Sequence, residues 1–306
     1  MSETPPTSIL LPTYDPGAVC EELAAQLDDE DELLVICDAD DDPAVQIANS
    51  LPDTVRIVIA GEPDRCSGKA NAIAAGMEAA RHDRIVWTDD DFHHPPDWLD
   101  RLHGDYEEHG PASELPFFVG KDPLAILLEP VYALAGTAGT YLGDVAWGGA
   151  VIFERDDLPD EGSFVRDLRR TVSDDGLLTD RVDITPVKRT RRVGIGGSVR
   201  ETIERHVRFT KIVRYHDPSG TVANAVGASL VAAGGLVFPV PAFVGLAILM
   251  LGLYAVFDLR RWTFLLAYPA LLLSVPLMAY GLLRRTFVWG GRRYRWRDKF
   301  TVEVVP

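Results

Sequence analysis

Apolar and polar positions alternate along the first 110 residues in a way that predicts strands separated by helices. Four short apolar runs have the composition of buried strands: residues 8–11, 33–37, 55–60 and 84–88. Three segments between them have helical composition: residues 15–27, 43–51 and 69–80. Asp15 is a good N-cap for the first helix, and Pro16 suits its first position. This order predicts a parallel sheet with helices on both faces, whose ligands bind beyond the carboxyl ends of the strands.

The pattern is less regular between about Gly110 and Asp217. A glycine-rich turn occupies residues 147–150. Further on, Ser198 and Glu201 form a capping box, which predicts a helix that extends to about Tyr215.

Two long apolar stretches follow. Residues 219–257 and 262–283 carry no formal charge, and about 20 apolar residues suffice to cross a bilayer. Pro239 and Pro241 interrupt the first stretch, which is therefore a tight two-helix hairpin, or one span plus a re-entrant or interfacial piece. Buried helices of a soluble core are the alternative, and two such stretches in succession favour the membrane.

Charge separates the two ends of the chain. The net charge is −16, but from Asp258 onward nine basic residues outnumber three acidic ones, so residues 1–257 carry −22. An acidic body is repelled by nucleic acid, whereas a basic end suits anionic lipid headgroups. Residues 1–7 have no basic or apolar region typical of a signal peptide, so we expect the body in the cytosol. The three cysteines form no C-x-x-C pair, which predicts reduced, buried thiols: Cys20, Cys37 and Cys66.

The basic clusters leave the number of spans open at two or three. Arg260 and Arg261 compete with the seven basic residues of 284–299 for the cytosolic side. Two spans leave the larger cluster inside, and three put it outside. We favour the even number.

Acidic residues follow two of the predicted strands. Asp89, Asp90 and Asp91 come directly after the fourth strand, and adjacent carboxylates repel one another unless water or a metal ion neutralises them. Hard oxygen ligands of this kind select Mg²⁺ or Mn²⁺. Asp38 follows the second strand, where a base or ribose could be held. The alternative in both cases is an ordinary acidic loop of an acidic protein.

Two further segments have both a functional and a structural interpretation. Lys69 opens the third helix after Ser67 and Gly68, so its ammonium group could meet phosphate, or Ser67 could simply cap the helix. Asp174 and Asp175 lie at the start of another probable helix, where carboxylates can do chemistry or complement the helix dipole.

A basic and aromatic cluster lies on the helix after Ser198. Arg205, Arg208 and Phe209 fall at i, i+3 and i+4 and share one face. Two guanidinium groups beside a ring can clamp phosphate, and a basic juxtamembrane helix that meets lipid headgroups is the other interpretation. His93 and His94 could ligate metal, although we expect a solvent-facing loop there.

The order of these motifs resembles glycosyltransferase family 2, within the GT-A superfamily. The segments in question are SILLPTYDPG, VICDADDDP, SGKANA, TDDDF, WGGA, SDD and RHVRF, followed by the apolar spans. The closest resemblance is to ceramide-glucosyltransferase-like enzymes, which are described by three Asp positions and a (Q/R)xxRW motif. The resemblance implies an α/β, Rossmann-like GT-A domain that binds a nucleotide sugar, followed by a transmembrane helical anchor.

The resemblance also implies roles for individual residues. Asp38 matches the first Asp position and Asp89 matches the second, and Asp91 completes a DxD-like metal site with Asp89. Asp175 matches the third Asp position, which is the catalytic base. The donor-binding set also includes Lys69, and the arginine motif is matched by Arg205, Arg208 and Phe209. Two residues depart from the pattern, because Asp174 replaces the usual Glu and Phe209 replaces Trp.

The implied activity is inverting, metal-dependent transfer of a hexose, with UDP-glucose as the expected donor, to a membrane lipid. We expect a multi-pass protein of the cell membrane with its catalytic domain on the cytoplasmic side and no nucleic-acid partner. The expected division is a nucleotide-sugar-binding half, an acceptor-side half, the transmembrane anchor and a basic tail: residues 1–110, 111–218, 219–283 and 284–306. The alternatives are transfer to polyprenyl phosphate, a polysaccharide synthase, and a non-catalytic membrane scaffold that kept the fold.

Overall fold

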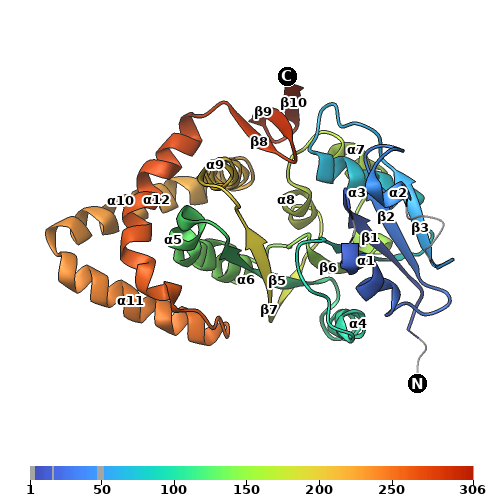
Figure 1. Ribbon diagram of the computed structural model, residues 1–306, viewed down its shortest axis with the longest axis horizontal. Helices are drawn as coiled ribbons and strands as arrows, with labels where there is room; N and C mark the ends of the chain where they lie inside the picture. Colours follow the sequence, from blue (N-terminus) through green and yellow to red (C-terminus); the bar gives the residue numbers. More distant parts are fainter. Residues whose placement is uncertain (1–3, 16, 47–51, 306) are drawn as a thin grey trace. The chain divides into compact units, whose positions relative to one another are not determined.

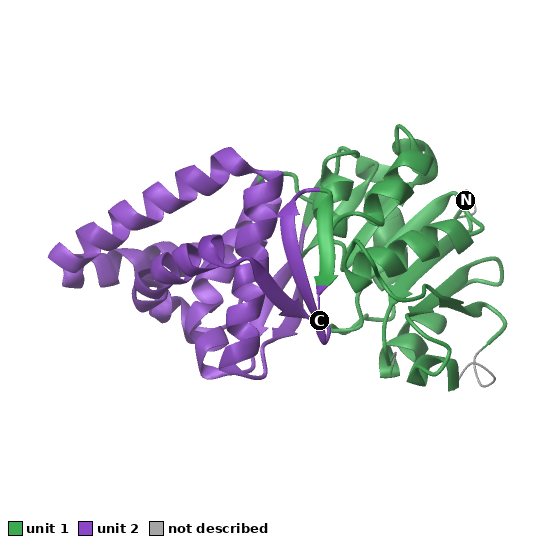
Figure 2. Ribbon diagram, turned by 90° about the horizontal axis from the view of Figure 1, so that it is seen from above, with its two compact units in different colours: residues 1–115, 143–187, 300–304 green, residues 116–142, 188–299, 305–306 purple. Residues whose placement is uncertain are grey.

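The computed structural model describes residues 4–15, 17–46 and 52–305. The chain forms two compact units (Figure 2). Unit 1 comprises residues 1–115, 143–187 and 300–304, and unit 2 comprises residues 116–142, 188–299 and 305–306. The expected functional division of the chain stays a prediction.

The alternation of strands and helices predicted for the first 110 residues is confirmed in unit 1 (Figure 1). Its elements are β1 (Thr7–Pro12), α1 (Gly17–Ala24), β2 (Glu32–Cys37), α2 (Pro43–Gln46), β3 (Val55–Ile59), α3 (Gly68–Ala79), β4 (Arg84–Thr88), α4 (Trp98–His109), β6 (Ala150–Glu154), the 3₁₀ turn η3 (Arg155–Asp157), α7 (Glu161–Leu168), α8 (Asp174–Thr179) and most of β10 (Thr301–Val305). Pro16 and residues 47–51, at the expected start of the first helix and end of the second, lie outside the described residues.

The sheet has the strand order β3-β2-β1-β4-β6-β5-β7. β5 (Ala112–Gly120) and β7 (Thr185–Ile195) begin in unit 1 and continue into unit 2. β1 pairs in parallel with β2 and β4, and β2 with β3, as expected. β6 pairs antiparallel with β4 and β5, so the sheet is mixed and not wholly parallel. Because β1, β2 and β4 are parallel, their carboxyl ends meet at one edge of the sheet.

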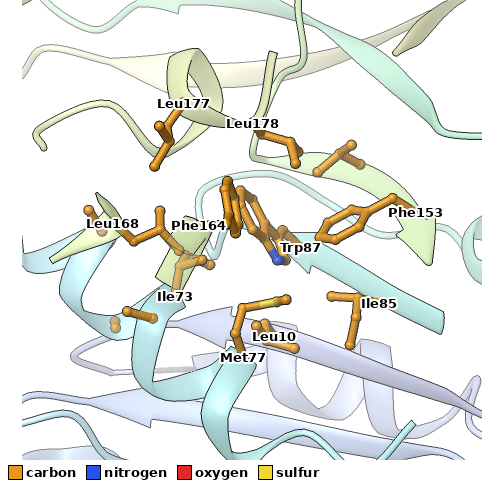
Figure 3. Packing of buried hydrophobic residues seen from close by; sticks show 14 of the residues in the cluster. Leu10, Ile73, Met77, Ile85, Trp87, Phe153, Phe164, Leu168, Leu177 and Leu178 are labelled. Carbon is orange, nitrogen blue, oxygen red and sulfur yellow. The ribbon is translucent and has the colours of Figure 1, made fainter. Parts of the chain in front are cut away.

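The core of unit 1 is built around Trp87 of β4 (Figure 3). Its ring stacks on Phe164 at 6.0 Å between centroids and meets Phe153 edge-on at 5.4 Å. Helix α3 packs close to the sheet at Gly76, where a Cβ atom would lie 2.4 Å from Cδ1 of Ile36. The edge that carries the acidic loops is therefore backed by a closely packed, fully buried core.

Unit 2 is mostly helical. Its elements are α5 (Pro123–Tyr132), the π-helical turn η2 (Ala133–Ala138), α6 (Gly139–Leu142), α9 (Val199–His216), α10 (Pro218–Val237), α11 (Pro239–Val256), the 3₁₀ turn η4 (Trp262–Leu266), α12 (Ala267–Leu283), β8 (Thr286–Trp289) and β9 (Arg292–Asp298). The helix predicted after Ser198 is confirmed as α9, and Ser198 caps it, because its Oγ accepts the N–H of Glu201.

Three helical segments of unit 2 are long and apolar enough to cross a membrane. They are Pro218–Val237, Pro239–Val256 and Trp262–Leu283, with 20, 18 and 22 residues. The break between the first two falls at Phe238, directly before the prolines that the sequence indicated.

Candidate functional site

The carboxyl end of β4 is tied to two neighbouring segments of unit 1. Oγ1 of Thr13, directly after β1, donates to Asp90 at 2.5 Å. Oγ1 of Thr88 donates to the carbonyl of Gly149 at 3.0 Å, and the Asp89 N–H reaches the same carbonyl at 3.3 Å. The segment after β1 and the segment before β6 thus both hold the acidic triplet in position.

Lys69 bridges two carboxylates that are far apart in the sequence. Its Nζ lies 2.6 Å from Asp89 and 3.3 Å from Asp174, and it donates to the carbonyl of Gly148 at 3.4 Å. Ser67 positions it, since its Oγ accepts the Ala70 N–H to cap α3 and donates to the carbonyl of Val172 at 2.9 Å. The lysine therefore links the end of β4 to the start of α8.

Burial makes these ion pairs consequential. The side chains of Lys69, Asp89 and Asp174 are 15%, 22% and 3% exposed. Burial raises the pKa of both carboxyl groups, an effect that the lysine opposes. The pKa of Lys69 is raised in spite of its burial, because Asp174, Asp89 and Asp175 all stabilise its charge. Lys69 is a cation under all physiological conditions, and it is outnumbered by acids.

Asp174 and Asp175 have different environments at the start of α8. Ser173 caps the helix by accepting the Gly176 N–H, and its Oγ lies 3.1 Å from Oδ1 of Asp175. Asp174 is buried against Lys69, whereas Asp175 is only half-buried. Of the two, Asp175 is the carboxylate that a ligand can reach.

Asp38 and Asp91 complete the acidic edge of unit 1. Asp38 is half-buried at the end of β2, where Oδ2 of Asp42 accepts its N–H at 2.9 Å and that of Ala39 at 3.0 Å. Asp91 is exposed and lies near enough to Asp89 to raise the pKa of that carboxyl group.

The acidic edge fits a divalent cation that shares its coordination with a bound ligand. One ammonium group cannot neutralise Asp89, Asp91, Asp174 and Asp175, so negative charge is left over at the site. Within the described part of the chain, no three acidic, His or Cys side chains are arranged to hold a metal ion by themselves. Mg²⁺ is commonly held by one or two carboxylates together with substrate phosphates, which is what this edge offers.

The predicted arginine cluster lies on α9 in unit 2. The guanidinium group of Arg205 lies beside the rings of Phe118 and Phe209, at 5.1 and 5.3 Å from their centroids. Arg208 stacks over Trp289 at 3.8 Å and lies 5.5 Å from Phe209. The shared face of these residues is therefore confirmed. Their convergence with the carboxylates of unit 1 stays a prediction.

Three features of unit 1 were not predicted: the contact of Asp174 with Lys69, the close approach at Gly148 and the burial of His94. Asp174 anchors Lys69, and Gly148 lets the chain approach, because a Cβ atom there would lie 2.8 Å from Asp174 Oδ2. The adjacent glycines of WGGA were a signal for such an approach. His94 was expected to face solvent, and this was wrong: it is 1% exposed, lies 2.7 Å from Thr88 Oγ1 and meets Trp98 edge-on.

The site thus lies on a mixed α/β sheet with carboxylates at its strand ends, in a chain that also has three apolar helices long enough to cross a membrane within its described part. The family model described as Glycosyl transferase family 2 matches residues 8–124, and the expected resemblance is confirmed there. The ceramide-glucosyltransferase-like subtype stays a prediction. No curated protein matches the sequence significantly.

Many solved structures show distant likeness to the chain, and two of them illustrate it. Glucosyl-3-phosphoglycerate synthase from Mycobacterium tuberculosis, in complex with Mn²⁺, UDP-glucose and phosphoglyceric acid, is 20% identical over 68% of this chain and 79% of its own, with a TM-score of 0.43. TarS 1–349 from S. aureus, in complex with UDP-GlcNAc, is 12% identical over 98% of this chain and 99% of its own, also with a TM-score of 0.43. What these two bind is a property of those proteins.

Proposed function

We propose that the protein is a metal-dependent, inverting glycosyltransferase that moves a hexose from a nucleotide sugar to a lipid hydroxyl at the membrane. UDP-glucose is the first candidate donor. The observation that carries the proposal is the arrangement around Lys69. Lys69 holds Asp89 and Asp174 in place and leaves Asp175 accessible beside them. This site lies at the edge of the sheet whose strands β2 to β4 fall within the family match.

Asp175 acts as the general base in this proposal. Its carboxylate takes the proton of the acceptor hydroxyl as that oxygen forms a bond to the anomeric carbon. The bond from this carbon to the diphosphate breaks on the opposite side, so the configuration inverts. Ser173 orients the carboxylate by its contact with Oδ1.

Other acidic and basic residues bind the donor. Asp38 holds the base or ribose, and Asp89 and Asp91 are the residues that would hold Mg²⁺ or Mn²⁺. Such an ion supplies positive charge to the departing diphosphate. Lys69 keeps Asp89 in position, and its ammonium group adds to the positive charge that favours phosphate.

Arg205 and Arg208 clamp the diphosphate, and Phe209 supports both guanidinium groups by packing. Stacking on rings supports this role, since it holds arginine side chains in defined positions before a ligand arrives. The three apolar helices support a lipid acceptor, because they bring the chain to the bilayer.

The test compares Asp175→Asn with Asp180→Asn, a matched change at the far end of the same helix. Membranes that contain each variant receive radiolabelled UDP-glucose, and the organic-extractable product is counted. We expect Asp175→Asn to lower the turnover by about 10²–10⁴-fold with donor affinity kept, and Asp180→Asn to leave both unchanged.

Two results would contradict parts of the proposal. Equal loss of donor binding and transfer in Asp175→Asn would remove Asp175 from the role of base. A preparation that transfers no label to any extractable product from any sugar nucleotide would exclude the lipid acceptor and favour a scaffold.

Chelation of divalent ions should stop transfer, and added Mn²⁺ or Mg²⁺ should restore it.

A further inference from the structure

The C-terminal segment belongs to the same unit as the N-terminal body. Residues 300–304 are part of unit 1, where Phe300 packs against the core and the Val304 N–H points to the carbonyl of Asp64 at 3.4 Å. Residues 1–115 and 300–304 therefore lie on the same side of any membrane. A chain that leaves from one side and returns to it crosses an even number of times. Since three helices in the described part of the chain qualify as spans, at least one of them does not cross.

The apolar segment Trp262–Leu283, which comprises η4 and α12, is tied to polar partners at both of its ends. At its start, Arg261 donates twice to Glu129 of α5, at 2.9 Å each, and Glu129 is completely buried. At its end, Arg284 pairs with Glu204 of α9 at 3.2 Å. A spanning helix would place these two ion pairs on opposite sides of the bilayer.

The partners of the two ends are too close together for a bilayer to separate them. Thr202 Oγ1 donates to Asp122 Oδ2 at 2.5 Å, which joins the start of α9 to the start of α5. Asp122 and Glu129 are seven residues apart on one helix, or about 10 Å. The hydrocarbon core is about 30 Å thick. α12 therefore follows the layer of α5 and α9 and does not pass through the membrane.

The hairpin of α10 and α11 has a wholly apolar end. Residues 230–253 contain only Ala, Val, Ile, Leu, Met, Phe, Pro and Gly. Phe238, at the turn between the helices, is 65% exposed, and its neighbours Val237 and Val240 are 69% and 70% exposed. Figures 1 and 2 show the turn pointing away from the rest of unit 2. A crossing hairpin would have to expose this turn to water or headgroups on the far side, where polar residues and Trp or Tyr are expected.

The backbone of the turn also suits hydrocarbon. In lipid every N–H needs a partner within the protein. The Phe238 N–H donates to Gly234 at 2.9 Å, and the Ala242 N–H donates to Phe238 at 3.0 Å. Pro239 and Pro241 have no N–H at all. Four of the five residues 238–242 thus leave no donor unsatisfied.

We infer that the protein enters the bilayer from one face only: the α10–α11 hairpin ends inside the hydrocarbon, α12 lies along the same face, and both chain ends stay on that side. This topology goes beyond the proposed function and does not depend on it. It replaces the expected multi-pass arrangement. The number of crossings is even, as expected, but it is zero.

Depth measurements distinguish a re-entrant hairpin from a crossing one. Nitroxide labels are attached to Ser219→Cys, Leu230→Cys and Phe238→Cys in the full chain, which is then reconstituted into phosphatidylcholine and phosphatidylglycerol vesicles. Leu230 is the matched control, because it is 67% exposed on the same hairpin. The parent chain, which carries only the buried native cysteines, is labelled in the same way, and its signal gives the background. The readout is the ratio of nitroxide accessibility to O₂, which partitions into hydrocarbon, over that to a water-soluble nickel chelate.

We expect the ratio to rise from Ser219 through Leu230 to its highest value at Phe238, at least threefold above Ser219. A hairpin that crosses has its maximum near Leu230. A ratio at Phe238 equal to or below that at Leu230 therefore overturns the inference. In sealed vesicles of uniform orientation, an impermeant maleimide should label Asp29→Cys and Arg297→Cys from the same side. Labelling of the two from opposite sides would also overturn it.

Discussion

Removal of the Lys69 ammonium group tests whether unit 1 depends on the bridge between Asp89 and Asp174. Lys69→Met keeps the length and the apolar stem of the side chain but leaves two largely buried carboxylates without their cation. Loss of one partner from a buried ion pair costs about 3–5 kcal/mol. We take the lower figure of about 3 kcal/mol, because Asp89 is partly exposed. For a unit of about 165 residues, this lowers the melting temperature by about 6–12 °C.

The loss should depend on pH in a defined direction. In Lys69→Met, burial and mutual repulsion raise the folded-state pKa of these carboxyl groups above the unfolded value near 4. The folded variant then binds more protons than the unfolded chain, so its stability rises as the pH falls. The deficit relative to wild type is therefore smallest at pH 5 and largest at pH 8.

Thermal unfolding in detergent, followed by tryptophan fluorescence at both pH values, measures the deficit. Adding Asp174→Asn to Lys69→Met removes the most buried charge and should restore part of the lost stability. Arg65→Met is the control, since Arg65 and its partner Asp64 are exposed and the change should stay within about 0.5 kcal/mol. An equal deficit at both pH values together with no recovery in the double variant would refute this reasoning.

Three further changes test other contacts. Gly148→Ala places a Cβ atom 2.8 Å from Asp174, so we expect at least a tenfold loss of transfer with the melting temperature lowered by a few degrees; unchanged activity would show that the loop yields freely. Glu129→Gln leaves the Arg261 guanidinium group without its buried carboxylate and should cost about 3 kcal/mol in thermal unfolding, and a neutral result would mean that this pair contributes no stability. Burial lowers the pKa of His206 to about 4, so between pH 6.5 and 4 the unfolded chain binds a proton that the folded chain does not. The stability should therefore fall by up to about 3 kcal/mol as the pH falls across that range. His206→Phe should flatten this part of the pH profile, and an unaltered profile would assign it to other groups.

The periodicity of the sequence was sufficient for the four parallel-strand segments, their helices and the positions of Asp38, Asp89 and Asp175 at element ends. These features depend on local patterns, because short apolar runs form strands and polar residues collect where strands end. The N-cap at Ser198 and the shared face of Arg205 and Phe209 are local for the same reason, since they follow from helical spacing alone.

Other features exist only because distant segments meet in space. Nothing in the sequence pairs Lys69 with Asp174, 105 positions away, or shows that β6 would enter the sheet antiparallel beside β4. The burial of His94 depends on Trp98 and Thr88, and the attachment of both ends of α12 depends on Glu129 and Glu204. Hydropathy measures how apolar a segment is, which predicts that these helices meet lipid. Whether a helix crosses is decided by which polar groups hold its ends, and that is set by tertiary contacts alone.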